Sequence, residues 1–230
     1  MPLISRYGRD IAIPVLFLSA VIFAGAWFIT SIPLRIFFLL LGGVIFLFTF
    51  WFFRDPERST QAGDELVICP ADGKVIAVYE VEENEYLQGR ARQISIFMSP
   101  LDVHVNRLPV SGMVEYVRHV RGAFTVAFAD KSSDVNERTL VGISCTHGKV
   151  LTKQIAGFIA RRIVCPLRRG DIARAGERFG MIRFGSRVDL LLPPIADVAV
   201  TPGQRVRAGE TVVARFRRGD SPGEEHHSTG

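Results

Sequence analysis

Two long apolar segments near the N-terminus constrain this chain more than any other feature. Residues 11–30 and 36–53 contain no charged side chain. Each is close to the roughly 20 apolar residues that an α-helix needs to cross the hydrocarbon core of a bilayer. Pro33 lies in the short connection between them and suits a tight turn. The sequence therefore predicts a membrane hairpin of two helical spans within residues 1–53.

A cleaved signal peptide followed by a single anchor is an alternative interpretation of the same segments. Arg6 and Arg9 precede the first segment, as in signal peptides, but no obvious small-residue cleavage site precedes the second. With Arg54 and Arg58 after the second segment, the positive-inside rule predicts both ends of the hairpin in the cytoplasm. We therefore expect the chain in the cytoplasmic membrane, with residues 54–216 on its cytoplasmic face.

The remainder of the chain divides into a globular part and a polar tail. Residues 54–216 form a stretch of about 160 residues, which is long enough for one hydrophobic core. Residues 217–230 contain almost no apolar side chain, so we expect this tail to be disordered. The adjacent His226 and His227 belong to the tail and do not indicate a metal site.

The globular part is predicted to be mainly β. Its apolar runs are short, rich in β-branched and aromatic residues, and separated by glycine, proline or charged breaks. The expected strands are residues 67–70, 73–82, 92–98, 112–120, 124–129, 139–145, 149–157, 181–186 and 187–193.

Two further segments refine the predicted architecture. Residues 157–165 are the one stretch that fits a short helix. Residues 202–213 alternate glycine turns with short strands, as in the flattened β-barrels that carry lipoyl or biotinyl groups, but they lack a lysine at a hairpin tip. The sequence therefore predicts a β-sandwich or flattened-barrel domain behind the two-helix transmembrane hairpin.

Charge and cysteine content narrow the class of protein. Eight arginines lie between Arg161 and Arg187 in a chain of net charge +5. They fit either a solvated surface or a face that meets anionic headgroups, and no aromatic platform accompanies them to indicate nucleic-acid binding. Cys69, Cys145 and Cys165 show no CxxC spacing, which argues against a disulfide framework or zinc site and favours packing as small apolar residues.

Three segments place polar residues where a strand would otherwise continue. Gly185-Ser186 interrupts a predicted strand, which usually marks a bulge or a close backbone approach. Asp102 and His104 directly follow an apolar strand and share one face if the chain is extended there, although such pairs often only cap a turn. Residues 70–74 read Pro-Ala-Asp-Gly-Lys, a typical turn sequence.

Together, these segments resemble the phosphatidylserine decarboxylase family, specifically its short, archaeal-type bacterial members. FGS is the most diagnostic motif, and the order and spacing of the set make it specific. The N-terminal apolar hairpin is also similar to the family. The matching segments are PADGKV at 70–75, FMSPLDVHVNRLPVSG at 97–112, NER at 136–138, QIAGFIARRIVC at 154–165 and GERFGMIRFGSRVDLLLP at 176–193.

The resemblance implies a proenzyme that cleaves itself between Gly185 and Ser186. The Ser186 hydroxyl would attack the Gly185 carbonyl, and elimination and hydrolysis would leave a pyruvoyl group on the small chain, which stays with the large chain 1–185. This group would form a Schiff base with the headgroup amine of phosphatidylserine and act as the electron sink for its decarboxylation to phosphatidylethanolamine in phospholipid biosynthesis. Neither pyridoxal phosphate nor a metal is then needed.

Asp102 and His104 are the base and acid candidates that the resemblance implies. Long bacterial members carry a further histidine before the NER segment, where this chain has Phe128. The family's Asp-His-Ser relay is therefore not transferred whole, and either His104 or another group is the processing base. An arginine is expected to meet the lipid phosphate, without indication of which one.

Other interpretations stay open at this stage. A membrane-anchored adaptor domain fits the composition but leaves the co-occurrence of FGS and SPLDVH unexplained. A serine peptidase using Ser186 or Ser99 lacks a GxSxG motif. Within the family, an ether lipid with the same headgroup would undergo the same chemistry. The expected partners are the lipid, the membrane and the two chains of one precursor, and a homo-oligomer stays open.

Overall fold

The structure is a computed structural model, and its described residues fall into two compact units. The units are Met1–Glu57 and Arg58–Gly230. The expected strand 124–129, Phe128, Gly185 and the tail from residue 218 lie outside the described residues. The described residues are 4–61, 63–122, 136–157, 162–183 and 186–217.

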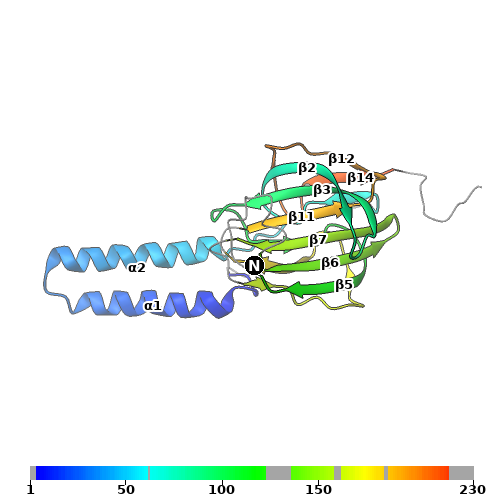
Figure 1. The fold of residues 1–230 in the computed structure, drawn as a ribbon. Helices are drawn as coiled ribbons and strands as arrows, with labels where there is room; N and C mark the ends of the chain where they lie inside the picture. Colours follow the sequence, from blue (N-terminus) through cyan, green and yellow to red (C-terminus); the bar gives the residue numbers. More distant parts are fainter. Residues whose placement is uncertain (1–3, 62, 123–135, 158–161, 184–185, 218–230) are drawn as a thin grey trace, which may run out of the picture. The chain divides into compact units, whose positions relative to one another are not determined.

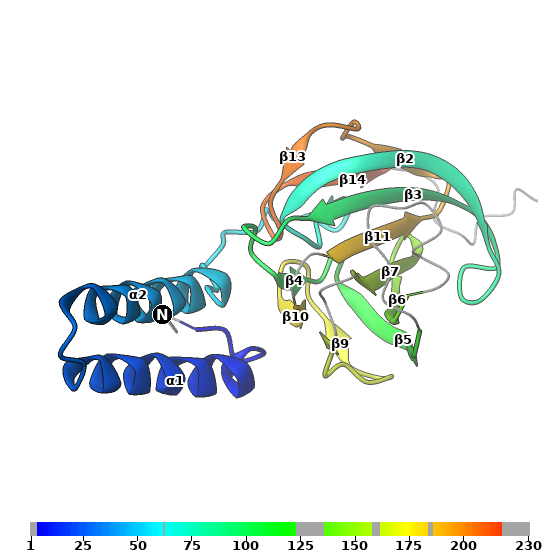
Figure 2. The ribbon, with the colours of Figure 1, turned by 60° about the vertical axis from the view of Figure 1, so that its left-hand side comes forward.

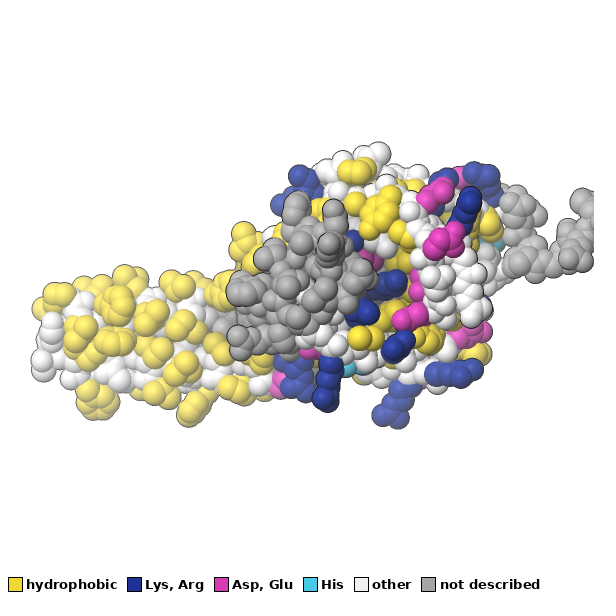
Figure 3. All heavy atoms as spheres, viewed as in Figure 1, with side chains coloured by type: hydrophobic (Ala, Val, Ile, Leu, Met, Phe, Trp, Pro, Cys, Tyr) yellow, Lys and Arg dark blue, Asp and Glu magenta, His cyan; other side chains and the backbone are white. Residues whose placement is uncertain are grey.

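The first unit is a hairpin of two apolar helices, α1 (Arg9–Trp27) and α2 (Ile32–Phe52). Pro33 lies in the first turn of α2, where its missing N–H would have no partner within the helix. Both helices are long and apolar enough to cross a membrane, and hydrophobic side chains cover most of their surface (Figure 3). The predicted hairpin is thus confirmed, and its apolar surface indicates membrane association.

The second unit is built on an eight-stranded antiparallel sheet that curls into a half-barrel (Figures 1 and 2). Its central strands are largely buried, which accounts for their apolar runs. In spatial order they are β13 (Arg205–Val206), β2 (Gly73–Glu83), β3 (Gly89–Met98), β11 (Ser186–Leu192), β7 (Gly148–Ala156), β6 (Arg138–Cys145), β5 (Gly112–Val120) and β9 (Ile172–Ala173).

Two three-stranded sheets share a core with the inner face of this large sheet. Each is held by antiparallel pairing between strands that are distant in the sequence. One sheet has the order β4 (Val105–Arg107), β10 (Arg178–Ile182) and β8 (Ile163–Val164), and the other β1 (Leu66–Ile68), β14 (Val212–Phe216) and β12 (Ala196–Val198).

The central strand β11 separates two layers of side chains. Val188 and Leu190 point into the main core, whereas Leu191 belongs to a second cluster on the opposite face. Tyr86, from the turn between β2 and β3, joins that second cluster. Its ring lies so close to Gly142 of β6 that any Cβ there would collide with it. The long β2–β3 hairpin therefore folds back over the outer face, and β11 is buried on both faces.

The predicted mainly β fold is confirmed, with one local correction. The expected helix at residues 157–165 does not extend to its C-terminal end, because Ile163 and Val164 form strand β8 and pair with Ile182 and Met181. Residues 158–161 of that segment lie outside the described residues. Tertiary pairing decides this segment, since two residues are too few to show a helical or strand period.

The cysteines pack as small apolar side chains, as predicted. Cys69 lies within the main core, and Cys145 and Cys165 pack against it. Burial raises the pKa of Cys69 to about 12 and that of Cys165 to about 11. These thiols therefore stay protonated and poorly nucleophilic at neutral pH.

Candidate active site

Ser186 is the first residue of β11, at one end of the central strand. It is fully buried, and its neighbours across the sheet are Met98 of β3 and Ala156 of β7. Its Oγ lies 3.4 Å from the Met98 Sδ. Because side chains alternate along a strand, Ser186 shares the face of Val188 and points into the main core. The preceding strand β10 ends at Ile182, so Ser186 lies where the chain passes from β10 into β11.

Segments that are far apart in the sequence meet around Ser186. The Asn136 side chain donates a 2.7 Å hydrogen bond to the carbonyl of Ala156, and the Ala156 N–H donates to the Glu137 carbonyl at 2.9 Å. On the other side, Asn106 Nδ2 lies 3.7 Å from the Met98 Sδ that Ser186 contacts, and it donates to the Pro70 carbonyl at 3.4 Å. The four segments that carry PADGKV, SPLDVHVN, NER and QIAG therefore converge on the strand that begins with Ser186.

A chain of buried amides leads towards Ser186. Gln154 Nε2 donates to Asn106 Oδ1 at 2.8 Å, and Asn106 Nδ2 lies 3.7 Å from Met98 Sδ. Gln154 Oε1 is buried and has no hydrogen-bond partner among the described residues. Gln154 pairs with Val188, so it faces the same side of the sheet as Ser186. An acceptor of this kind normally receives a hydrogen bond, which makes it a candidate contact for a polar ligand.

Sequence reasoning did not single out Asn106 or Gln154. Both lie inside segments that carry the family resemblance, but each is one polar residue in an apolar strand. The available signal was their polarity at positions where strand alternation requires an apolar side chain.

His104 lies in the interior, next to the end of β10. It is fully buried, and its carbonyl accepts the N–H of Ile182 at 3.3 Å. Three residues separate Ile182 from Ser186, and they span at most about 14 Å. The structure therefore places the His104 backbone in the same region of the unit as Ser186.

Asp102 lies in the turn that precedes His104. Its Oδ2 accepts the N–H of Ser99 at 2.8 Å, and its Oδ1 accepts from Arg205 Nη1 at 3.2 Å. The chain turns at residues 100–102, so the alternation of an extended strand does not apply between Asp102 and His104. The Asp102 carboxylate caps this turn, which is the simpler of the two interpretations of the Asp-x-His pair.

Asp72 acts as a cross-link in the expected turn at residues 70–74. Its Oδ1 accepts the N–H of Ala208 at 2.8 Å, and its Oδ2 accepts from Arg58 Nη2 at 2.9 Å. The turn prediction is confirmed, and the structure adds an ion pair that local sequence patterns do not reveal.

The arginine-rich stretch splits into buried and exposed members. Arg187 is buried and donates to Asp189 Oδ1 at 2.6 Å and to Ser95 Oγ at 2.9 Å. Burial acts to lower the pKa of Arg187, but the charge of Asp189 outweighs it and the pKa is raised. Arg183 is also buried. The exposed members are Arg162, Arg168, Arg169 and Arg174.

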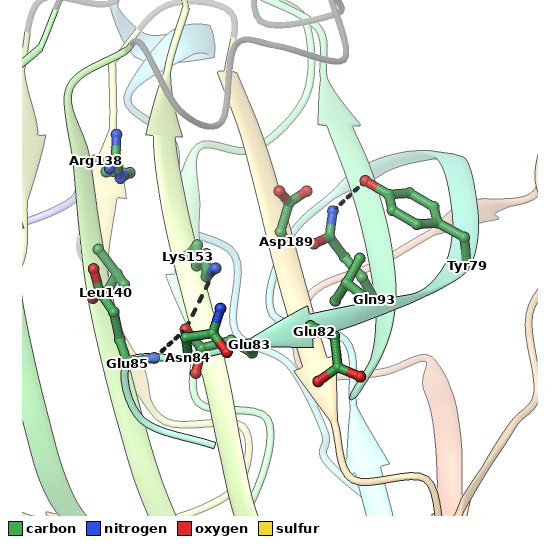
Figure 4. Close-up of a pocket in the computed structure, with 11 residues that line it drawn as sticks. Tyr79, Glu82, Glu83, Asn84, Glu85, Gln93, Arg138, Leu140, Lys153 and Asp189 are labelled. Atoms are coloured by element: carbon green, nitrogen blue, oxygen red, sulfur yellow. Dashed lines mark hydrogen bonds and ion pairs between the residues drawn. The ribbon is translucent and has the colours of Figure 1, made fainter. Parts of the chain in front are cut away.

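A polar hollow of about 400 Å³ lies on the other face of the sheet (Figure 4). It is bounded by the β2–β3 hairpin and by side chains of β6, β7 and β11, among them Tyr79, Gln93, Lys153 and Asp189. Because Asp189 alternates with Ser186 and Val188 along β11, this hollow opens away from the Ser186 side chain. It is therefore separate from the candidate site.

His119 and His147 each have a structural contact. His119 Nδ1 lies 2.9 Å from Thr139 Oγ1, and His147 stacks on Phe216 with 5.0 Å between ring centroids. Among the described residues, no group of three or more His, Cys, Asp or Glu side chains is placed to hold a metal ion.

Comparison with known proteins identifies close relatives. The family model described as phosphatidylserine decarboxylase matches residues 45–214, from within α2 into β14. The phosphatidylserine decarboxylase proenzyme of Chlorobium luteolum is 45% identical over 215 residues, which cover 93% of this chain and 100% of that protein. The proenzyme of Salinibacter ruber is 48% identical over 182 residues, which cover 77% and 79% of the two chains.

Proposed function

The chain belongs to the phosphatidylserine decarboxylase family, and we propose that Ser186 is the residue at which it cleaves itself and which becomes its pyruvoyl group. It is a phosphatidylserine decarboxylase proenzyme that forms phosphatidylethanolamine in phospholipid biosynthesis. A proenzyme of this family is cut into two chains, here 1–185 and 186–230. The convergence of four distant family segments on Ser186 is the observation that carries the assignment.

Self-cleavage at Ser186 follows from its position and chemistry. The Ser186 Oγ attacks the carbonyl carbon of Gly185, the C–N bond breaks, and the acyl group moves to oxygen as an ester. Removal of the Ser186 α-proton expels the Gly185 carboxylate and leaves dehydroalanine. Water then replaces the nitrogen, which departs as ammonia. Complete burial of Ser186 protects the ester from premature hydrolysis.

The two chains stay together because Ser186 begins a central strand. After the cut, β11 belongs to the small chain, while its neighbours β3 and β7 belong to the large chain. Six or seven residue pairs join β11 to each neighbour. The new N-terminus of the small chain is therefore held between two strands of the large chain.

The surroundings of Ser186 fit a small planar group. Ala156 and Met98 leave an apolar environment beside it, and Gln154 Oε1 provides a buried acceptor for the amino headgroup of the lipid. The pyruvoyl group supplies the electron-withdrawing carbonyl that takes up the electron pair left by carbon dioxide. Burial and the neighbouring strands fix the position of that carbonyl.

We assign His104 as the base in the self-cleavage reaction and Asp102 as the residue that positions His104. His104 is buried beside the end of β10, where an imidazole can remove a proton without competition from bulk water. The Asp102 carboxylate accepts hydrogen bonds from Ser99 and Arg205. It therefore stabilises the turn that precedes His104.

His104→Ala is expected to slow chain cleavage by about 100-fold or more, the usual contribution of a general base. Asp102→Asn is expected to slow it much less, because its contact with Arg205 is exposed and screened by solvent. The appearance of the small chain on denaturing gels, after synthesis into nanodiscs, measures both rates. Wild-type cleavage in folded His104→Ala protein would move the base to another residue.

The intact mass of the purified wild-type protein tests the proposed cleavage. We expect two chains cut between Gly185 and Ser186, with the small chain lighter by one ammonia than an unmodified chain 186–230. The small chain should be blocked to N-terminal sequencing and should react with hydroxylamine. A single chain of 230 residues with unmodified Ser186 would overturn the assignment.

The orientation of the anchor is part of the proposal. Arg6 and Arg9 before α1, and Arg54 and Arg58 after α2, favour both ends of the hairpin on the cytoplasmic side. The second unit then acts on the cytoplasmic leaflet of the cytoplasmic membrane. Protease protection in sealed vesicles tests this orientation.

A further inference from the structure

We propose that the end of the large sheet that carries Ser186 docks on the anionic surface of the bilayer. A ring of exposed cations and one exposed leucine form this surface. The inference rests on the proposed role of Ser186 and adds how the second unit meets its lipid. We call its four exposed cations, Lys74, Arg121, Arg162 and Arg205, the cationic rim.

The register of the strands defines this end of the sheet. Ser186 pairs with Met98 and with Ala156, and each of these is the last residue of its strand. Ile155 pairs with Arg138, which in turn pairs with Val120 at the end of β5. One edge of the half-barrel therefore runs across five strand ends, with Ser186 near its middle.

Each member of the cationic rim is fixed close to this edge. Lys74 pairs with Phe97 and with Arg205 of β13. Arg121 directly follows Val120 at the end of β5. The carbonyl of Arg162 accepts the N–H of Arg183, three residues before Ser186. All four cations are exposed, so they surround Ser186 from separate parts of the chain.

The acidic residues at this edge do not cancel the positive charge of the cationic rim. Asp72, Asp102 and Glu137 are acidic side chains of the described residues near it, and all three are mostly buried. Asp102 pairs with Arg205 at 3.2 Å, and Glu137 lies 3.5 Å from His119. The other end of the β2–β3 pair has the opposite character, because Glu80, Glu82, Glu83 and Glu85 outnumber Arg90 and Arg92 there. An anionic surface is therefore attracted to the Ser186 end.

Leu101 gives the same edge an apolar contact. It is 65% exposed, at the tip of the turn that follows Met98. The contact of Asp102 with the Ser99 N–H holds the shape of this turn. An exposed leucine among cations is the combination found where proteins lie in the headgroup region of a membrane.

The chain also enters the second unit at this edge. Arg58, the first residue of the unit, pairs with Asp72, which lies one residue before the start of β2. Only residues 53–57 connect α2 to Arg58. A connection of this length spans at most about 20 Å, which limits the length of chain between the end of α2 and Arg58.

A probe on Leu101 tests the docking in the full-length protein. Leu101→Cys is labelled with an environment-sensitive fluorophore and reconstituted in phosphatidylcholine nanodiscs with or without phosphatidylglycerol, an anionic lipid that is not the substrate. Cys145→Ser and Cys165→Ser remove the partly buried thiols, and Cys69 stays buried. Met113→Cys is the matched control, because Met113 is 53% exposed but pairs with Ser144 at the opposite end of the sheet.

We expect spin-labelled lipid to quench the probe at Leu101 at least about twice as strongly as the probe at Met113. The difference should grow with phosphatidylglycerol and shrink at high salt, since screening weakens contacts between exposed charges. Combined Lys74→Gln, Arg121→Gln and Arg162→Gln should reduce the quenching. Combined Arg168→Gln, Arg169→Gln and Arg174→Gln should not, because these arginines lie outside the rim.

Equal quenching at both positions, or a Leu101 probe that stays in water on anionic discs, would overturn the docking surface. Shielding of the probe that depends on protein concentration rather than on lipid charge would assign the edge to a second copy of the chain, and would also overturn it. Chain cleavage is read from the same samples on gels. Normal cleavage with an unquenched probe rejects the docking alone, whereas a quenched probe on an uncut chain rejects the role of Ser186.

Discussion

Ser186→Ala is expected to leave the chain as one polypeptide of 230 residues with no decarboxylase activity above background. Alanine has no oxygen to attack the Gly185 carbonyl, so neither the ester nor the pyruvoyl group can form. Denaturing gels report the cut, and release of labelled carbon dioxide from phosphatidylserine reports activity. Both signals should disappear together, because the pyruvoyl group that decarboxylation needs forms only through the cut.

Thermal stability and one further variant separate chemistry from folding at this position. Ser186→Ala removes only one oxygen beside Met98 and Ala156, so its thermal midpoint should stay close to that of an uncut wild-type precursor. Ser186→Thr keeps the hydroxyl but adds a methyl group to a fully buried site, where overpacking carries a cost. It should therefore cleave slowly and incompletely. A Ser186→Ala protein that is cut and active would refute the assignment.

Strand alternation and apolar runs predicted most of the large sheet, because its strands are long enough to show a period. β2, β3, β5, β6, β7 and β11 each cover seven or more residues. Strands such as β8, β9 and β13 have two residues each. They are defined by the partner that they meet, and partner choice depends on long-range register rather than on local pattern.

The sequence predicted which segments contribute to the candidate site, but it did not predict how their side chains are arranged. The Gly-Ser motif predicted Ser186, and the structure adds the strand junction at which it lies. Asp102 and His104 differ in surroundings because the chain turns between Ser99 and Asp102. Gln154 meets Asn106 only because β4 and β7 belong to sheets that pack together, and no local pattern encodes such a contact between strands.

The burial of residues in the arginine-rich stretch was likewise not predicted from the sequence. Arg183 and Arg187 have the charge of surface residues, yet both are buried. Asp189, two residues after Arg187, was the available signal, because residues i and i+2 share a face of a strand. On a strand that is covered on both faces, such a pair indicates a buried ion pair rather than a solvated surface.

Asp189→Ala is expected to lower the free energy of unfolding by about 3–5 kcal/mol, the usual cost of leaving one partner of a buried ion pair without the other. Arg187 donates to Asp189 at 2.6 Å, and both side chains are almost completely buried. Thermal unfolding of the full-length protein in detergent measures the loss. The effect should be large because the hydroxyls of Ser95 and Tyr79 that remain beside Arg187 do not replace the charge of the carboxylate. Asp189 lines the polar hollow (Figure 4).

Two controls test whether burial, rather than the ion pair itself, sets this cost. Arg217→Gln breaks an exposed pair with Asp197 of similar length, 2.7 Å, and should cost less than about 1 kcal/mol. Arg187→Met combined with Asp189→Leu removes both charges and should recover most of the stability that Asp189→Ala loses. If Asp189→Ala lowers the free energy of unfolding no more than Arg217→Gln does, solvent in the hollow stabilises the charge of Arg187 in place of Asp189. The position of Ser186 would then depend on the pairing of β11 with β3 and β7 alone, because the ion pair next to it would no longer hold the strand.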